Sequence, residues 1–201
     1  MRTLIASLLS CAFLLLPACG QSREARTESA LLADHPPADF WLGITVLRPV
    51  PLGAIINART EPPNSTVPRP ARYIVEADAI LRVAIGYGAT ERTFPPETRQ
   101  LTPRQLAEIW QLLRDSALVD PDHPDRTGRI PELEEFSRIT QGRGGYSVSF
   151  CIAGDRRILA IDEASPAAAD ARRLVDQLAA LAWIKPQAAA DPETPSTEQT
   201  P

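Results

Sequence analysis

The feature that most constrains the fold is a pair of alternating apolar runs between Gly145 and Asp162, separated by Gly154-Asp155. Alternation with a period of two is typical of strands, and a Gly-Asp pair between two such runs favours a two-residue hairpin turn. Counting outward from this turn pairs Ile152 with Arg157. One face then carries Tyr146, Val148, Phe150, Leu159 and Ile161, and the other carries Ser147, Ser149, Cys151, Ile158 and Ala160. The pattern predicts a hairpin whose first face is buried. It does not decide whether the second face contacts solvent or the core.

The strongest helix signal begins at Thr102. Thr102 is a good capping residue, Pro103 suits the first helical position, and Gln105 has the spacing of a capping box. The apolar residues that follow recur at steps of three and four, which is typical of one buried helix face. These are Leu106, Ile109, Trp110 and Leu113. We expect this helix to end near Leu118, before Pro121.

Three further elements complete the expected domain. Residues 40–47 alternate as a strand does, and residues 73–87 form two short strands around the turn 77–79. Ser165 and Pro166 begin a last helix as its cap and first residue. In the second hairpin, Tyr73, Val75, Leu81, Val83 and Ile85 share one face; the last helix buries Leu174, Val175, Leu178 and Leu181. The order predicts an α+β fold, with two helices on one face of a mostly antiparallel sheet.

The chain divides into four parts. Residues 1–18 have the charged start and short apolar core of an export signal, too short to span a bilayer. Residues 19–38 are polar, with no apolar period, and are expected to be a flexible tether. Residues 39–185 are expected to form one domain. Residues 186–201 are rich in proline and threonine and are expected to be a disordered tail.

The end of the export signal reads Leu16-Pro17-Ala18-Cys19. This motif resembles the lipobox of bacterial lipoproteins. The resemblance implies that the thiol of Cys19 is acylated, that the chain is cut between Ala18 and Cys19, and that the membrane is a partner through this lipid. Gly20 follows the cysteine, whereas aspartate there retains such proteins in the inner membrane in the family pattern. The expected location is therefore the cell envelope, at the outer membrane if the cell has two.

Charge and cysteine content narrow the function further. The formal net charge is −4, and the arginines are scattered rather than clustered, which argues against nucleic acid as a partner. As the lipobox resemblance implies, Cys11 would leave with the signal and Cys19 would carry lipid, so that Cys151 would be the remaining thiol. We expect it to be an inert core residue. A thiol that forms a dimer and a reactive thiol are the alternatives.

Asp120, Asp122, His123 and Asp125 form the densest set of potential ligands. Their alternation suggests a calcium loop, but an EF-hand needs glycine at the sixth position and glutamate at the twelfth, where this chain has Asp125 and Pro131. We expect a solvated loop, and neither a metal nor a cofactor.

The carboxylates and nucleophiles of the chain do not form a recognisable catalytic set. Glu132, Glu134 and Glu135 are expected to form an acidic patch on a helical turn. Ser147 and Ser149 lie within a strand rather than on a nucleophile elbow. A hydrolase with His123 as its base stays as an alternative, but the chain is expected not to be an enzyme.

Three smaller motifs offer binding roles. Residues 142–145, Gly-Arg-Gly-Gly, have the composition of an anion-binding nest, but they lead into a strand, so a flexible entry to the hairpin is favoured. Arg156 and Arg157 are expected at a solvated hairpin tip. Tyr87, between two glycines, is open to contact with a partner or to packing beside the core.

The layout from Tyr73 to Trp183 resembles emfourin-type inhibitors of metalloproteases. The resemblance rests on a strand pair, the entry Arg99-Gln100-Leu101-Thr102, a helix, a hairpin and a final helix after Pro166. It implies an inhibitor. The reading favoured by the residues themselves is an exported, lipid-anchored protein that binds a component of the cell envelope, with an envelope protein as a candidate partner.

Overall fold

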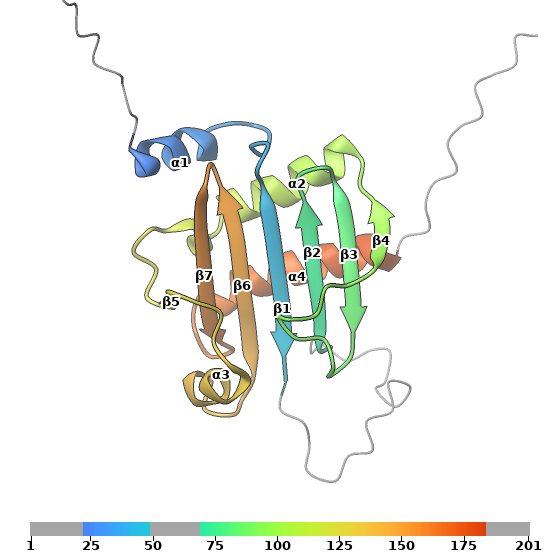
Figure 1. Cartoon of the computed structure of the whole chain (residues 1–201), viewed down its shortest axis with the longest axis vertical. Coiled ribbons are helices and arrows are strands. Elements are labelled where there is room, and N and C mark those ends of the chain that lie inside the picture. The colour runs from blue at the N-terminus through green and yellow to red at the C-terminus, as the bar shows by residue number, and fades with distance from the viewer. Residues whose placement is uncertain (1–21, 49–68, 184–201) are drawn as a thin grey trace, which may run out of the picture.

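The computed structural model describes residues 22–48 and 69–183. Within these ranges the chain forms a seven-stranded antiparallel sheet with strand order β4-β3-β2-β1-β6-β7-β5 (Figure 1). The strands are β1 (Trp41–Leu47), β2 (Ala71–Glu76), β3 (Ile80–Ile85), β4 (Glu97–Gln100), β5 (Arg126–Thr127), β6 (Gly145–Ile152) and β7 (Asp155–Asp162). The predicted α+β class is confirmed.

Helices cover one face and both ends of this sheet. Helices α2 (Pro103–Arg114) and α4 (Ala168–Trp183) lie across one face, as predicted (Figure 1). Helix α1 (Arg23–Leu31) lies at the end where β6 turns into β7, and α3 (Leu133–Ile139) lies at the opposite end. We call these the α1 end and the α3 end. None of the helices in ranges 22–48 and 69–183 is long and apolar enough to cross a bilayer.

The apolar core lies between the sheet and helices α2 and α4. Trp110 of α2 is fully buried and meets Phe40 edge to face, with ring centroids 5.4 Å apart. The predicted core faces of β6, β7 and α4 are all buried there, which confirms the sequence pattern. They contribute Tyr146, Val148, Phe150, Leu159, Ile161, Leu174, Val175, Leu178 and Leu181.

The register of the β6–β7 hairpin differs from the predicted one. Ile152 pairs with Asp155 instead of Arg157, so Ala153-Gly154 forms the two-residue turn. Both turn residues have positive φ, 52° for Ala153 and 80° for Gly154, which is the geometry of a type I′ turn. Glycine thus takes the second turn position, and Asp155 starts β7. Because the shift is two residues and side chains alternate with a period of two, every residue keeps its predicted face.

The β2–β3 hairpin has the predicted register. Val75 pairs with Leu81, and Tyr73 pairs with Val83. Ala79 takes the left-handed turn position, with φ 66°, where glycine is more usual. On the face opposite the core, Glu76 and Arg82 form an ion pair at 2.9 Å, as their shared face allows.

Helix α2 starts as predicted and ends earlier. The capping box of Thr102 and Gln105 is present in both directions. The helix ends at Arg114, however, not near Leu118. The hydroxyl of Ser116 donates to the Leu113 carbonyl at 2.6 Å, and the chain then forms a short 3-10 turn over Ala117–Val119. This local hydrogen bond competes with helix continuation.

Helix α4 begins at Ala168, two residues later than predicted from Pro166. The hydroxyl of Ser165 donates to Asp125 at 2.9 Å, so it ties the loop before β5 to the start of α4. The same oxygen accepts weakly from the Ala167 amide at 3.4 Å. The cap residue therefore also makes a tertiary contact that the sequence pattern did not indicate.

The segment 22–38 differs from the expected flexible tether. It contains α1, whose cap is Ser22. Thr27 is only 3% exposed, because its hydroxyl points at the sheet and reaches the Ile152 carbonyl at 3.4 Å. Ala30 and Leu31, on the same side of the helix as Thr27, pack against the core. Two apolar residues are too few to show helical periodicity, so the sequence pattern did not indicate this helix.

The sheet face opposite α2 and α4 is buried and polar. Arg72 donates to the Thr45 hydroxyl at 2.7 Å, and both side chains are buried. Burial lowers the pKa of Arg72, and the charge of Glu91, in the β3–β4 connection, partly offsets this. Ser147 and Ser149 are buried on the same face. Most of the second hairpin face, which the sequence left open, is therefore buried, whereas Cys151 at its end is partly exposed.

Candidate functional site

Two neighbouring hollows lie on the surface at the α3 end, and the first of them lies between the end of β1 and α3. Its volume is about 280 Å³. Leu133 is 66% exposed at its rim, whereas Phe136, one helical turn later, is buried. The lining residues are Leu47, Arg48, Leu133, Phe136, Ser137, Thr140, Gly142 and Gly144. The lining is therefore mostly apolar, with one arginine.

A tight turn after α3 forms one wall of this hollow. The amide of Gly142 donates to the Ser137 carbonyl at 2.9 Å, and the amide of Arg143 donates to Thr140 at 2.9 Å. Gly142 and Gly144 have φ of 71° and 93°, in the left-handed region that favours glycine. Residues 142–145, considered as an anion nest, thus use two of their amides to close α3. They lead into β6, as the favoured reading expected.

The charged groups around this hollow are paired with one another. Arg48 forms an ion pair with Glu163, and Arg143 forms one with Asp162 at 3.1 Å. Burial opposes ionisation of Asp162, but the Ala164 amide and Arg143 outweigh it and lower the pKa of this carboxyl. The rim is therefore polar and locally neutralised, around an apolar interior.

A second hollow lies on the other side of Leu133, with a volume of about 340 Å³. Arg92 and Glu132 form an ion pair at its wall, which joins the β3–β4 connection to the start of α3. Its lining residues are Thr90, Glu91, Arg92, Ile130, Pro131, Glu132 and Leu133. We call the two hollows, with the Leu133 side chain that both share, the Leu133 site.

The three glutamates singled out by the sequence lie at the start of α3. Glu132 is the N-cap residue, and Glu134 and Glu135 are in the first turn. Negative charge at a helix N-terminus is favourable, and Glu135 also pairs with Arg129 at 2.8 Å. The three glutamates therefore share one helical turn, as predicted, but Arg92 and Arg129 neutralise two of them.

The aspartate-rich loop 120–125 is organised by its own hydrogen bonds. Asp120 accepts from the Asp122 amide at 2.9 Å, and Nδ1 of His123 accepts from the Asp125 amide at 3.1 Å. His123 is 6% exposed. Within ranges 22–48 and 69–183, no group of three or more His, Cys, Asp or Glu side chains is arranged to hold a metal ion.

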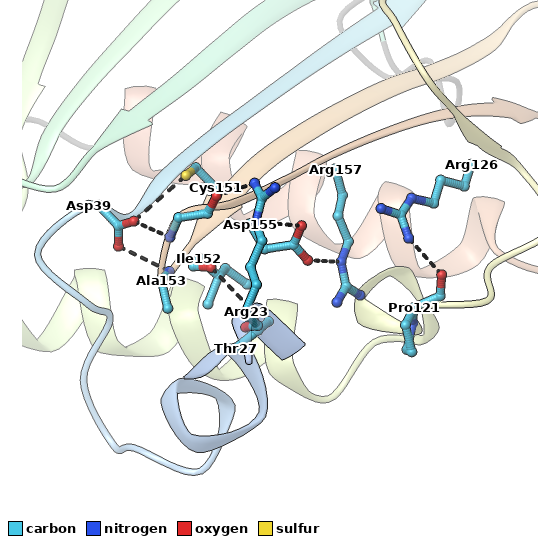
Figure 2. Close-up of polar contacts among 11 residues, drawn as sticks. Arg23, Thr27, Asp39, Pro121, Arg126, Cys151, Ile152, Ala153, Asp155 and Arg157 are labelled. Carbon is cyan, nitrogen blue, oxygen red and sulfur yellow. Dashed lines mark hydrogen bonds and ion pairs between the residues drawn. The ribbon is translucent and has the colours of Figure 1, made fainter. Parts of the chain in front are cut away.

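Cys151 lies at the α1 end, beside the β6–β7 turn (Figure 2). Its sulfur lies 3.8 Å from Asp39, which also accepts from the amides of Ala153 and Gly154. Burial, and then the negative charge of Asp39, raise the pKa of this thiol. A raised pKa reduces the thiolate fraction, so the surroundings do not activate Cys151 as a nucleophile. It is partly exposed rather than a core residue, and with Trp41 and Arg156 it lines a hollow of about 300 Å³.

The two arginines past the hairpin turn have different surroundings. Arg156 is exposed, as expected. Arg157 is 5% exposed, so its assignment to a solvated tip is wrong. It pairs with Asp155 at 2.8 Å (Figure 2). It also donates to the Val119 carbonyl. The two-residue register shift explains this, because it moves Arg157 away from the turn and opposite Phe150. Tyr87 is half-buried.

The structure does not gather the sequence candidates into one site. His123, Cys151 and the glutamates lie in three separate regions, and Ala18 and Cys19 lie outside the described residues. The Leu133 site was missed by sequence reasoning, apart from residues 142–145 and Glu132. The spacing of Leu133 and Phe136 after Pro131 was the available signal for a short amphipathic helix.

Comparison with known protein families, curated proteins and solved structures found no match.

Proposed function

We propose that this chain is an exported protein, anchored in the cell envelope by lipid on Cys19, that binds an envelope protein through the Leu133 site. The observation that carries the proposal is the place of this site. It lies at the α3 end, and the chain enters the described domain at the α1 end (Figure 1). Strand β6 has eight residues and separates the two ends by about 25 Å. A partner therefore reaches the Leu133 site without meeting the anchor.

The dimensions of the site favour a protein partner. Pockets for small molecules usually have volumes of about 300–1,000 Å³. The hollow between β1 and α3, at about 280 Å³, is at the small end of this range. Leu133 lines both hollows and is 66% exposed. It therefore presents an apolar side chain with a hollow on each side. Apolar side chains of a partner fit such a surface.

The anchor is proposed from the lipobox at Leu16 to Cys19. Two or three acyl chains hold a protein on a membrane far more firmly than one chain does. We expect labelled fatty acid to enter the wild-type protein and not Cys19→Ala, and globomycin to cause the precursor to accumulate. Equal labelling of the two proteins would contradict the anchor. Gly20 after the cysteine favours the outer membrane where the cell has one.

The binding surface is tested by site-specific photo-crosslinking in cells. A photoreactive amino acid at Ser137, on the rim of the first hollow, is expected to give a discrete adduct with one envelope protein. The same amino acid at the exposed Arg104 of α2 is expected to give none. Leu133→Arg should abolish the adduct, and the matched change Leu32→Arg, at a leucine that is 79% exposed on the other end, should leave it intact. Loss in both variants, or an adduct with neither position, would refute the assignment of the surface.

An emfourin-like protease inhibitor is the second candidate. The observed order of β2–β3, α2, β6–β7 and α4 is the layout on which that resemblance rests. The purified domain should then inhibit a thermolysin-like protease in a dose-dependent way. No effect at micromolar concentrations would remove this candidate for the proteases tried.

A hydrolase that uses His123 as its base is the third candidate, and the geometry favours it least. His123 is buried, and its Nδ1 accepts a hydrogen bond from the loop itself. Retention of any hydrolytic activity by His123→Ala would exclude it.

A further inference from the structure

Helix α1 is attached to the β6–β7 turn by polar contacts. The Thr27 hydroxyl shares its one hydrogen between the Arg23 carbonyl of its own helix, at 3.1 Å, and the Ile152 carbonyl, at 3.4 Å. Arg23 donates to the Gly154 carbonyl and lies 3.7 Å from the Asp155 carboxylate (Figure 2). The start and the middle of α1 are therefore held to strands more than 120 positions later in the chain, since Thr27 and Ile152 are 125 residues apart.

The residues after α1 are attached as well. The carbonyl of Ala33 accepts from the indole of Trp110 at 2.9 Å and also from Arg114. Trp110 is fully buried in the core, so this contact fixes the chain to α2. Asp39 then accepts the two amides of the β6–β7 turn. From residue 22 to residue 39, the chain therefore belongs to the folded domain.

This docking determines the length of chain between lipid and domain. Cys19 and Ser22 are three residues apart in the sequence, and three residues span at most about 10 Å however they are arranged. Were α1 detached, the free chain would reach from Cys19 to about Asp39, and roughly twenty residues of flexible chain average about 25 Å. Docked α1 thus converts a long connection into a short one.

We propose that docked α1 holds the α1 end of the domain against the lipid bilayer, so that the Leu133 site faces away from the membrane. The partner of the α1 end is a lipid surface, and the inference rests on the proposed lipid on Cys19. The end presents Leu32, which is 79% exposed, and its exposed charged groups are Arg23, Arg26, Arg156, Glu24, Glu28, Asp34 and Asp39. Because the basic groups do not outnumber the acidic ones, attraction to anionic lipid does not set the orientation, and the short connection does.

The orientation is measured by fluorescence quenching in vesicles. The full mature protein carries Cys151→Ser and one new cysteine with an environment-sensitive dye, either Arg156→Cys at the α1 end or Glu134→Cys at the α3 end. Both positions are exposed. Phosphatidylcholine vesicles contain a lipid with a nitroxide on its head group. We expect severalfold stronger quenching at residue 156 than at residue 134.

A second pair of variants tests the role of α1. Thr27→Lys places a charge at a buried position and should release α1, which should bring the quenching at residue 156 close to that at residue 134. Ser29→Lys adds the same charge at an exposed position of the same helix and should preserve the difference. An unchanged difference in Thr27→Lys would overturn the role assigned to α1.

The outcomes separate this inference from the proposed function. Mass spectrometry of the N-terminal peptide shows whether Cys19 carries lipid. Equal quenching at residues 156 and 134 in lipid-bearing protein would overturn the orientation and leave the anchor standing. Absence of lipid from Cys19 would overturn both.

Discussion

The two ends of the sheet are completed by different kinds of contact. At the α1 end, polar atoms from separate segments meet: Asp39 accepts from the β6–β7 turn, and Thr27 donates to Ile152. At the α3 end, Leu133 and Phe136 stand beside hollows, and the ion pairs are confined to the rim. Hydrogen bonds with particular partners hold one arrangement, whereas a hollow beside an exposed leucine leaves apolar surface for another molecule. The proposed function accordingly assigns attachment to the first end and recognition to the second.

The largest effect is expected from Phe136→Ala, which removes the buried aromatic ring under α3. Loss of a buried phenylalanine lowers the free energy of unfolding by about 3–5 kcal/mol. Urea unfolding followed by circular dichroism measures it. Leu133→Ala, at the exposed neighbour, should change the value by no more than about 0.5 kcal/mol. Similar decreases in unfolding free energy in both variants would mean that Phe136 is not more tightly packed than Leu133.

A smaller loss is expected from Gly145→Ala, at the start of β6. A Cβ atom there would lie 2.0 Å from the carbonyl oxygen of Ile161, which is backbone and must shift. Such overpacking usually lowers stability by about 1–3 kcal/mol. Gly128→Ala is the control, since a Cβ at Gly128 meets nothing within 4 Å. Equal unfolding free energies for the two variants would show that β6 and β7 are less closely paired at this point.

At the α1 end, Asp39→Asn should make Cys151 more reactive. Burial and the Asp39 charge both raise the pKa of the thiol, so removal of the charge lowers the pKa and raises the thiolate fraction at pH 8. We expect severalfold faster reaction with a disulfide reagent, followed by absorbance. Asp78→Asn, in the turn of the other hairpin, should leave the rate unchanged. A rate equal to wild type in Asp39→Asn would refute the influence of this carboxylate.

The smallest effect concerns acid stability at the α3 end. The pKa of Asp162 is lowered in the fold, so its stabilising contribution is present above the unfolded carboxyl pKa and is lost as the pH falls through the folded value. Arg143→Gln should lower the free energy of unfolding at pH 7 by at most about 1 kcal/mol, because the pair is partly solvated. The difference from wild type should shrink in acid. A difference that grew as the pH fell would contradict this sign.

Several features of the fold were predictable from residues close together in the sequence. The capping box at Thr102 formed because its two hydrogen bonds join residues three positions apart. The faces of β6 and β7 survived a wrong register because a two-residue shift keeps side-chain parity. The Leu133 site was less predictable, since α3 has only seven residues and its hollows need β1 and the β3–β4 connection as walls.

The sequence by itself determined the alternation of the strands and the start of α2, because each depends on neighbours along the chain. The export signal with its lipobox stays a prediction from the sequence. The tertiary structure alone decided that residues 22–38 join the domain, that Arg157 is buried, and that hollows form around Leu133. The physical reason is distance along the chain. Thr27 and Arg157 find their partners 125 and 38 residues away, and no local periodicity encodes such contacts.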